Sequence, residues 1–429
     1  MSQLTPRKRI SREIRLLIAL VIGLGTLLTM STIAEAAGLA NARATGMAGA
    51  YTSLAKGYYC PSFNPANLGL TAYQVRGIQL FGVGASVKNN SLTLDDYNHY
   101  TGARLSEYEK QELLSKVPAE GLKVSADGEA TALAFGMGSF AVSLSAMGAA
   151  EINLGRTAVE LLLNGNAIAD TVNLEGIYGE GYGLASLNLA YGCPLYKSGD
   201  RQLAVGATLR LLKGLGFEQV TEANGHAVTL TTGFEGSGSL VARSASGGSG
   251  FTLDLGTTLQ ISKDYTVGAT LFNSLSAVRW NNETEEHYFT FSLDTLTAVN
   301  MSDDSIVVST DTTMEVDPFT SHLPSTIKAG LARTTGSFLW AVDWEQGFKL
   351  AAGSSPNPRF SAGGQYHLFS FLPLRAGLGI GGKQGMTYAG GVGIDFSLFH
   401  LDLGVANYNA IAGSTGKGLN VAISSGFQF

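Results

Sequence analysis

The sequence predicts an all-β protein, a transmembrane antiparallel β-barrel of about 14 strands. Three observations support this class. Residues 418–429 alternate apolar with small or polar side chains and end on Phe429. The first residues have the composition of a secretory signal, and the remaining chain combines few charges with no long apolar run. A terminal aromatic residue on an amphipathic strand is typical of barrels from the bacterial outer membrane, which is the expected location.

The N-terminus predicts a signal peptide at residues 1–36. Basic residues precede an uncharged run from Leu16 to about Met30, and Ala-Glu-Ala at 34–36 supplies small residues for cleavage. An uncleaved membrane anchor is the alternative, but the run is short of the roughly 20 apolar residues that a spanning helix needs. Removal of five positive and two negative charges changes the net charge from −6 to −9. This acidic balance argues against nucleic acid as a partner.

The composition of the chain narrows its class. Glycine accounts for 55 of 429 residues, charged residues for 14% and hydrophobic residues for 45%. Apolar residues that are spread by alternation suit a barrel wall that faces lipid, because there each backbone group must bond to a neighbouring strand. A soluble β-sandwich or β-helix is the alternative, but neither accounts for the low charge.

Segments with a period of two residues, about 10 to 16 residues long, are expected to be tilted membrane strands. Fourteen segments fit this description: 74–88, 122–137, 139–149, 177–193, 201–216, 250–262, 264–280, 324–334, 337–347, 358–369, 373–382, 387–397, 399–409 and 419–429. Residues 228–241 also alternate loosely, but including them gives an odd number. Bacterial barrels have even strand numbers, short periplasmic turns and long outer loops. We therefore assign four long segments to the outside: 89–121, 150–176, 217–249 and 281–323.

The two faces of the strands differ in chemistry. In residues 251–260, Phe251 and Leu253 lie on one face and Asp254 and Gln260 on the other. A charge on the lipid face costs about 2 to 4 kcal/mol for Arg or Lys, so the charged faces are expected to line the lumen. This parity predicts a set of lumenal charges: Arg210, Asp254, Lys328, Asp343, Arg375, Asp395 and Asp402. They form either an ion-pair network that stiffens the barrel or a polar constriction that contacts a ligand.

Residues 37–72 lie between the signal peptide and the first strand. They are rich in small side chains and nearly uncharged. A segment of this kind could fold into the barrel as a plug. We therefore expect an N-terminal hatch at 37–72 and a barrel at 73–429.

Short motifs in this hatch suggest a relationship. Gly46-Met-Ala-Gly-Ala50, followed by Asn64-Pro65-Ala66 and then by the first strand, resembles the hatch of the FadL-type outer-membrane barrels, the long-chain fatty-acid transporters, and their relatives linked to type IX secretion. The strand pair that contains residues 250–256 and 267–273 is similar to that family too.

The resemblance implies a fourteen-strand, porin-like barrel with an internal hatch. It also implies passive uptake of hydrophobic, fatty-acid-like molecules, which are captured at the outer rim and released by a change in the hatch or by a sideways opening. The alternative is a non-conducting barrel that anchors or hands over secreted or surface proteins.

Two outer segments contain candidate helices. Ser106 and Glu109 form a capping box ahead of the first apolar run, and Asn164-Gly165 ends the second. Together the helices offer a candidate outer groove: Leu113, Leu114, Val117, Leu161, Leu162 and Leu163. The alternative is that the two helices pack on each other as a lid.

The chain has two cysteines, Cys60 in the hatch and Cys193 at the predicted periplasmic end of a strand. The periplasm permits disulfides, so a bond that tethers hatch to wall is one hypothesis. Strand parity, which points Cys193 outward, argues against it.

Catalysis is the least favoured class of function. The six histidines are spread along the chain and none has the spacing of a nucleophile pair or a metal site. We expect no enzyme activity, no catalytic residue, no metal and no cofactor. The expected partners are outer-membrane lipid, a hydrophobic small molecule, and the barrel-assembly machinery through the C-terminal strand, with the protein acting as a monomer.

Overall fold

The computed structural model describes residues 38–164, 171–173, 176–230, 233–296, 307–383, 385–411 and 413–429. The predicted signal peptide lies outside these residues. Among the helices of this part of the chain, none is both long enough and apolar enough to cross a membrane.

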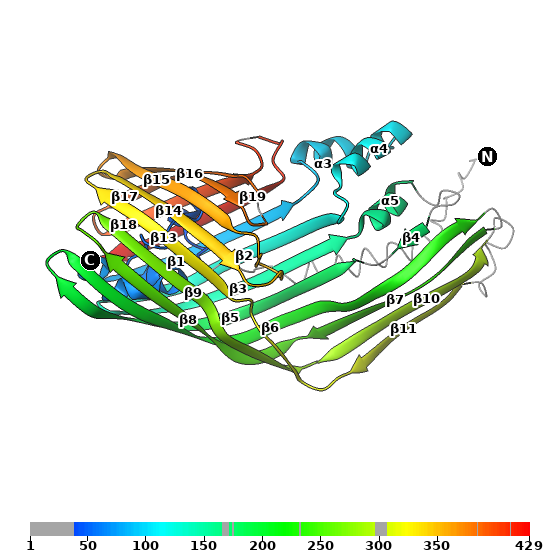
Figure 1. Cartoon of the computed structure of the whole chain (residues 1–429), viewed down its shortest axis with the longest axis horizontal. Helices are drawn as coiled ribbons and strands as arrows, with labels where there is room; N and C mark the ends of the chain where they lie inside the picture. Colours follow the sequence, from blue (N-terminus) through cyan, green and yellow to red (C-terminus); the bar gives the residue numbers. More distant parts are fainter. Residues whose placement is uncertain are drawn as a thin grey trace, which may run out of the picture.

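Fourteen strands form a closed antiparallel barrel (Figure 1), which confirms the predicted fold class. In order around the wall they are β1 (Gly77–Asn89), β2 (Leu122–Met137), β3 (Phe140–Leu154), β5 (Tyr178–Ser198), β6 (Arg201–Leu230), β8 (Gly247–Gln260), β9 (Tyr265–Asn282), β13 (Thr326–Thr335), β14 (Phe338–Gly347), β15 (Arg359–Phe369), β16 (Leu372–Gly381), β17 (Thr387–Phe396), β18 (Phe399–Tyr408) and β19 (Gly418–Gln428). Each coincides with one of the segments predicted from the period of two residues.

The last strand closes the ring against the first. Gly77 lies opposite Gln428 in the β1–β19 ladder, and the backbone N–H of Phe429 donates to the carbonyl oxygen of Arg76 at 2.9 Å. Along β8, Phe251 and Leu255 are exposed, whereas Thr252 and Asp254 are buried. The exposed face of the wall is thus apolar and the inner face is polar, as the parity of the strands predicts.

The two ends of the barrel differ. One end has short turns, for example at Gly138 and Gly336, and the other carries the long connections. Residues 217–249 and 281–323, which we expected to be loops, are largely strands. They contain β7 (Gly233–Ala245), β10 (Glu285–Leu296), β11 (Val307–Glu315) and β12 (Phe319–Ser321).

The loop prediction was wrong because the alternation in β6 continues beyond the wall. From Phe217 onward β6 pairs with β7, which pairs with β10, which pairs with β11. We call residues 217–230 of β6 together with β7, β10 and β11 the wing. Figure 1 shows the wing extending beyond the long-loop end of the barrel. The wing adds no strand to the fourteen of the wall, although residues 217–219, 247–249 and 281–282 at the ends of the two segments belong to wall ladders.

Short helices complete the fold. Inside the barrel, the hatch contains α2 (Ala42–Gly46), η1 (Gly57–Ser62), η2 (Pro65–Gly69) and η3 (Thr71–Tyr73). At the long-loop end lie α3 (Leu94–Tyr100), α4 (Glu107–Lys116) and α5 (Arg156–Asn164), and a three-residue strand, β4 (Thr171–Asn173), pairs with β6.

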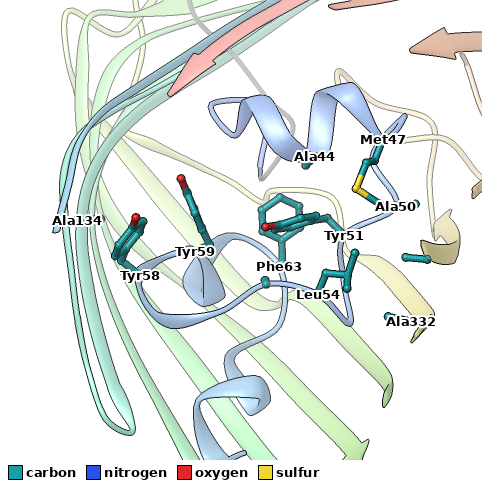
Figure 2. Close-up of a cluster of buried hydrophobic side chains, with 12 residues drawn as sticks. Ala44, Met47, Ala50, Tyr51, Leu54, Tyr58, Tyr59, Phe63, Ala134 and Ala332 are labelled. Atoms are coloured by element: carbon teal, nitrogen blue, oxygen red, sulfur yellow. The ribbon is translucent and has the colours of Figure 1, made fainter. Parts of the chain in front are cut away.

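The hatch has a buried apolar core. Its members come from the hatch and from small wall residues, as Figure 2 shows: Ala44, Met47, Ala50, Tyr51, Leu54, Ala55, Tyr58, Tyr59, Phe63, Ala134, Ala332 and Ala341. Tyr58 and Tyr59 approach edge to face with ring centres 4.6 Å apart. Both hydroxyl groups lie within hydrogen-bond distance of His400 Nε2 in β18. The hatch is therefore a packed part of the barrel interior.

Candidate functional site

Buried charged side chains of the wall bind the hatch at two places. In one, Arg210 Nε donates to Asp254 at 2.8 Å, and the same guanidinium donates to the carbonyl oxygen of Pro61 in the hatch. In the other, Asp402 accepts from Arg43 of α2 at 2.7 Å and pairs with Arg375 of the wall at 2.8 Å. These predicted lumenal residues thus form separate tethers between wall and hatch.

Wall carboxylates also bind backbone N–H groups of the hatch. Asp343 accepts from the N–H groups of Tyr51 and Thr52 at 3.0 and 2.9 Å. Glu129 does the same for Gly38 and Ala40. A buried carboxylate is stabilised when it accepts several hydrogen bonds. The sequence analysis did not select Glu129, although the same strand parity that selected Asp254 would have placed it inside.

The Asn64-Pro65-Ala66 motif begins a tight hatch turn. Asn64 caps η2 by accepting from the N–H of Ala66, and its amide donates to the carbonyl oxygen of Thr257 in β8. Pro65 stands at the first position of the helix, where its missing N–H costs nothing. The motif therefore shapes the hatch and binds it to the wall.

Inward-facing wall glycines make room for this turn and its neighbours. A Cβ at Gly206 would lie 2.5 Å from the backbone nitrogen of Ala66, and one at Gly136 would lie 2.6 Å from that of Tyr58. Cβ atoms at Gly377 and Gly404 would likewise meet hatch backbone. A wall of larger residues would push the hatch away. The high glycine content noted in the sequence thus has a structural role that the sequence alone does not show.

A cavity of about 120 Å³ lies between the hatch and the wall, toward the long-loop end. Its charged lining contains Lys88, Asp127, Lys328, Glu345, Arg359 and Lys383. Lys88 pairs with Asp127 at 2.9 Å and Lys328 with Glu345 at 3.0 Å. Arg359 donates to the carbonyl oxygen of Ala48 in the hatch. Three of the four cations each pair with a carboxylate, Lys383 with Glu151, so one positive charge is in excess and the cavity favours an anionic or strongly polar group.

The connection between β14 and β15 folds into the barrel beside this cavity. Gly353 and Ser354 line the cavity, while Ala352 is fully buried in an apolar cluster on the other side. Lys383 contacts both Glu151 and the carbonyl oxygen of Ala351, and so fixes this loop to the wall. The loop separates the polar cavity from the apolar cluster.

Several wall ladders carry register shifts, and one of them, in β9, spans two extra residues. Leu253 of β8 pairs with Leu275 and Leu255 pairs with Leu271, so several β9 residues stand opposite Asp254. Within this bulge Asn273 has a φ of 51°, a left-handed conformation that asparagine tolerates better than most residues. Bulges locally disrupt a β-ladder and redirect side chains.

On the other side of β9 the ladder is interrupted. The pairing with β13 stops at Phe272 and the pairing with β12 resumes at Val278. We call residues 273–277 and 322–325 the seam. Four side chains bridge it. Asn273 donates to Pro324 O at 3.0 Å, Ser276 to Leu323 O at 3.2 Å and Ser325 to Asn273 O at 2.8 Å. His322 Nδ1 lies 2.5 Å from the carbonyl oxygen of Ser276.

The seam adjoins the cavity. Lys328, which lines the cavity, places its Nζ atom 5.7 Å from the ring centre of Phe272, the last ladder residue before the seam. Leu323 of the seam and Val278 beside it belong to the apolar cluster around the fully buried Trp280. A small ligand in the cavity would thus be separated from the seam by Lys328 and Phe272.

The predicted outer groove is largely closed. Leu113, Leu114 and Val117 are buried, and α4 contacts α5. Arg156 at the start of α5 donates to the carbonyl oxygen of Val117. Leu162 is exposed, whereas Leu161 and Leu163 are half-buried. This arrangement matches the lid alternative more closely than an open groove.

The disulfide hypothesis is wrong, because both cysteines are free. Cys60 is fully buried in the hatch, where its thiol donates to the carbonyl oxygen of Ala55. Cys193 pairs in the β5–β6 ladder with Val205, which is exposed on the outside of the wall. Since directly opposed residues share a face, the barrel wall separates the two thiols.

Two of the predicted lumenal charges, Lys328 and Asp395, take no part in the contacts that bind the hatch to the wall. Lys328 belongs to the cavity, and Asp395 is half-buried in β17, opposite His400 and next to a short turn. Within the described residues there is no group of three or more His, Cys, Asp or Glu side chains that could hold a metal ion.

Solved structures with this architecture identify the fold. The structure of the toluene transporter TbuX from Ralstonia pickettii matches with a TM-score of 0.52 and 13% identity, covering 90% of this chain and 98% of that one. This chain has the fold of that transporter. A TodX monoaromatic hydrocarbon channel mutant matches with a TM-score of 0.51 and 13% identity, covering 90% and 98%. The predicted resemblance to FadL-type barrels is thus confirmed for the fold.

Comparisons by sequence add little. The model of a family of unknown function, DUF5723, matches residues 65–240. No curated protein matches the sequence. Residues 65–240 include the Asn64-Pro65-Ala66 turn only in part, and of the strands that pack against it they contain β5 and β6 but not β8.

Proposed function

We propose that this protein is an outer-membrane channel for the passive uptake of small hydrophobic molecules with an acidic or polar head group. In this proposal the signal peptide at 1–36 is removed, the hatch at 37–72 closes the axis, and the barrel at 73–429 spans the bacterial outer membrane. The apolar outer face of the wall supports a membrane location. The fold shared with toluene transporters supports uptake of hydrophobic compounds.

The observation that carries the proposal is the seam beside the cavity. The hatch backbone packs against wall glycines, so a route along the barrel axis requires the hatch to leave its tethers. The seam instead replaces a backbone ladder by four side-chain hydrogen bonds, each contributing about 1 kcal/mol. A ligand that enters from the long-loop end is therefore proposed to leave sideways, past Phe272 and through the seam.

Uptake into vesicles tests the function. Purified protein is reconstituted, and entry of the apolar dye 1-N-phenylnaphthylamine and of a fluorescent fatty acid is compared with entry into protein-free vesicles. Faster entry of both probes, with the fatty acid favoured, is the expected result. Entry at the rate of protein-free vesicles would contradict transport of hydrophobic molecules.

A cross-link tests the route. In a background without native cysteines, Asn273→Cys with Ser325→Cys closes the seam, since these residues are hydrogen-bonded across it. Leu331→Cys with Val342→Cys provides a matched control in the regular β13–β14 ladder. Oxidation should slow uptake only in the seam variant, and reduction should restore it. Equal effects in both variants, or none, would rule out the sideways route.

A non-conducting barrel that binds secreted or surface proteins is the second candidate. The close fit of the hatch backbone against Gly206 and Gly136 favours it, because this fit closes the axis without a visible way to open. A reconstituted barrel that transports neither probe and captures a defined protein segment would support this role over uptake.

A further inference from the structure

The wing ends in an open strand edge. Every ladder pair of β11, from Glu315 opposite Glu285 to Val307 opposite Leu293, is formed with β10. The other edge of β11 pairs with no strand in the described part of the chain. From Val308 to Glu315 all of its residues are exposed, and Figure 1 shows β11 at the margin of the wing.

Apart from two acidic residues, this edge lacks the features that usually protect one. Exposed edge strands are normally short, or carry charged side chains (lysine above all), proline or a bulge, because unpaired N–H and C=O groups bind other strands. β11 is 9 residues long and reads Val-Val-Ser-Thr-Asp-Thr-Thr-Met-Glu, with no lysine and no proline. Its register against β10 is continuous. A strand of this composition, rich in β-branched residues, is a ready template for a further strand.

The charged residues of β11 are all acidic and lie on one face of the strand. Asp311 and Glu315 are four positions apart, so their side chains lie on the same face of β11. Glu315 also stands directly opposite Glu285, a cross-strand pair of like charges that is unfavourable by itself. The arginine of the wing, Arg243, is paired with Glu286 at 2.9 Å. The edge is therefore complementary to a basic segment.

A second copy of the chain fits this edge poorly. Antiparallel pairing of two β11 strands along their full length would place Asp311 opposite its own copy, because it is the central residue. Like charges in directly opposite positions destabilise a sheet. The charge pattern thus favours a different polypeptide.

We propose that β11 is a docking edge for an extended segment of a partner protein, which adds a strand to the wing and carries basic side chains four positions apart. Main-chain hydrogen bonds along β11 supply affinity in this binding mode, and the alternating side chains supply specificity. The two basic side chains pair with Asp311 and Glu315 on one face. The proposal does not depend on whether the barrel conducts.

A synthetic peptide tests the proposal on the purified full-length protein. The probe matches the 9 residues of β11 in length, consists of threonine and valine, and has two lysines on one face with the spacing of Asp311 and Glu315. We expect saturable binding by fluorescence anisotropy, weaker at high salt, and slower amide exchange in residues 307–315. A peptide with its lysines on opposite faces should bind more weakly. Binding without slower exchange in 307–315, or binding indifferent to lysine spacing, would overturn the proposal.

Substitutions locate the site. Asp311→Asn and Glu315→Gln should each weaken binding by about threefold, as expected for exposed ion pairs. Glu222→Gln on β6 is the matched control, since it removes an exposed wing carboxylate away from the edge. An equal loss with Glu222→Gln would mean general attraction to an acidic wing. Concentration-dependent dimerisation that slows exchange in β11 without peptide would identify a second copy as the occupant. Either result would refute the proposed partner.

Discussion

At the scale of single residues, Asp402 of β18 joins the hatch to the wall. It lies between two guanidinium groups, Arg43 of the hatch and Arg375 of the wall, and all three side chains are largely buried. Removing one member of a buried ionic group leaves its partners uncompensated in a medium of low polarity. The Asp402 carboxylate is therefore important for stability chiefly because its removal would leave two buried guanidinium groups without a counter-charge.

Asp402→Ala is expected to destabilise the protein by about 3 to 5 kcal/mol. Chemical unfolding in detergent measures the loss, and trypsin cleavage after Arg43 reports whether the hatch is released. Asp395→Ala is the control, because that side chain is half-buried in the same barrel and lies outside the tethers. Similar losses for the two variants would contradict the special position of Asp402.

The two thiols should differ in reactivity. Burial raises the pKa of the Cys60 thiol well above its ordinary value, and the nearby Lys56 opposes this only in part. A maleimide is expected to modify Cys193 in the folded protein and Cys60 only after unfolding, since the thiolate is the reactive form. Mass spectrometry of labelled peptides provides the measurement. Rapid labelling of Cys60 in the folded protein would show that the hatch opens readily.

At the scale of elements, the helices over the long-loop end form a lid held by a few polar contacts. Lys116 of α4 pairs with Asp96 of α3 at 2.6 Å. Thr93 caps α3 by accepting from the backbone N–H of Asp96, and the Asp96 carboxylate accepts in return from the backbone N–H of Thr93. Partial burial by itself raises the pKa of Asp96, but the hydrogen bonds from Lys116 and Thr93 outweigh it, so the pKa is lowered from 3.8. The contact between α3 and α4 is therefore sensitive to pH.

The pairing of α3 with α4 should weaken in acid. Because the pKa of Asp96 is lower in the folded lid than in the unfolded chain, its contribution is fully present above about pH 4 and is lost as the pH falls through the lowered pKa. Amide exchange in residues 93–101, corrected for intrinsic rates, should show opening below that pH. Asp96→Asn should remove the pH dependence. A variant with the same pH profile as the parent would assign the effect to other groups.

At the scale of the whole molecule, hatch and wall fit each other through backbone contacts. Wall glycines lie against hatch backbone at Gly206, Gly136, Gly377 and Gly404. Such contacts have little freedom to adjust, because neither partner is a flexible side chain. The barrel and its hatch therefore behave as one packed body in which the polar tethers add specificity.

Gly206→Ala should destabilise the folded protein by about 1 to 3 kcal/mol, the usual cost of overpacking. Its new Cβ would press on the backbone between Pro65 and Ala66. Gly364→Ala is the matched control, since the nearest atoms there are 3.5 Å away or more. Thermal unfolding in detergent measures both. If the two variants lose the same stability, the close fit around Gly206 is not important.

Much of the barrel could be predicted from local pattern. A strand that separates lipid from lumen must alternate apolar and polar side chains, so the period of two residues locates all fourteen wall strands and the inward direction of Arg210 or Asp343. Composition also sets the hatch apart from the wall. These properties depend on neighbouring residues and are visible in one sequence.

The contacts that give these residues their roles could not be predicted. Arg43 and Asp402 are 359 positions apart, and parity says which way a side chain points but not what it meets. Residues 228–241 alternate as wall strands do, although they belong to the wing, because strand period does not specify a pairing partner. The seam has no pattern of its own, since a bulge at Asn273 arises from the register of three strands at once.

The sequence by itself determined the class of fold, the strands, their faces and the existence of a hatch, because each follows from the chemistry of a chain that faces lipid on one side. Only the tertiary structure decided that wall charges tether the hatch, that glycines admit its backbone, that the two cysteines are separated by the wall, and that β11 presents an open edge. These features depend on which segments, far apart in the sequence, become neighbours in the fold. The alternation of side chains along one strand does not specify those neighbours.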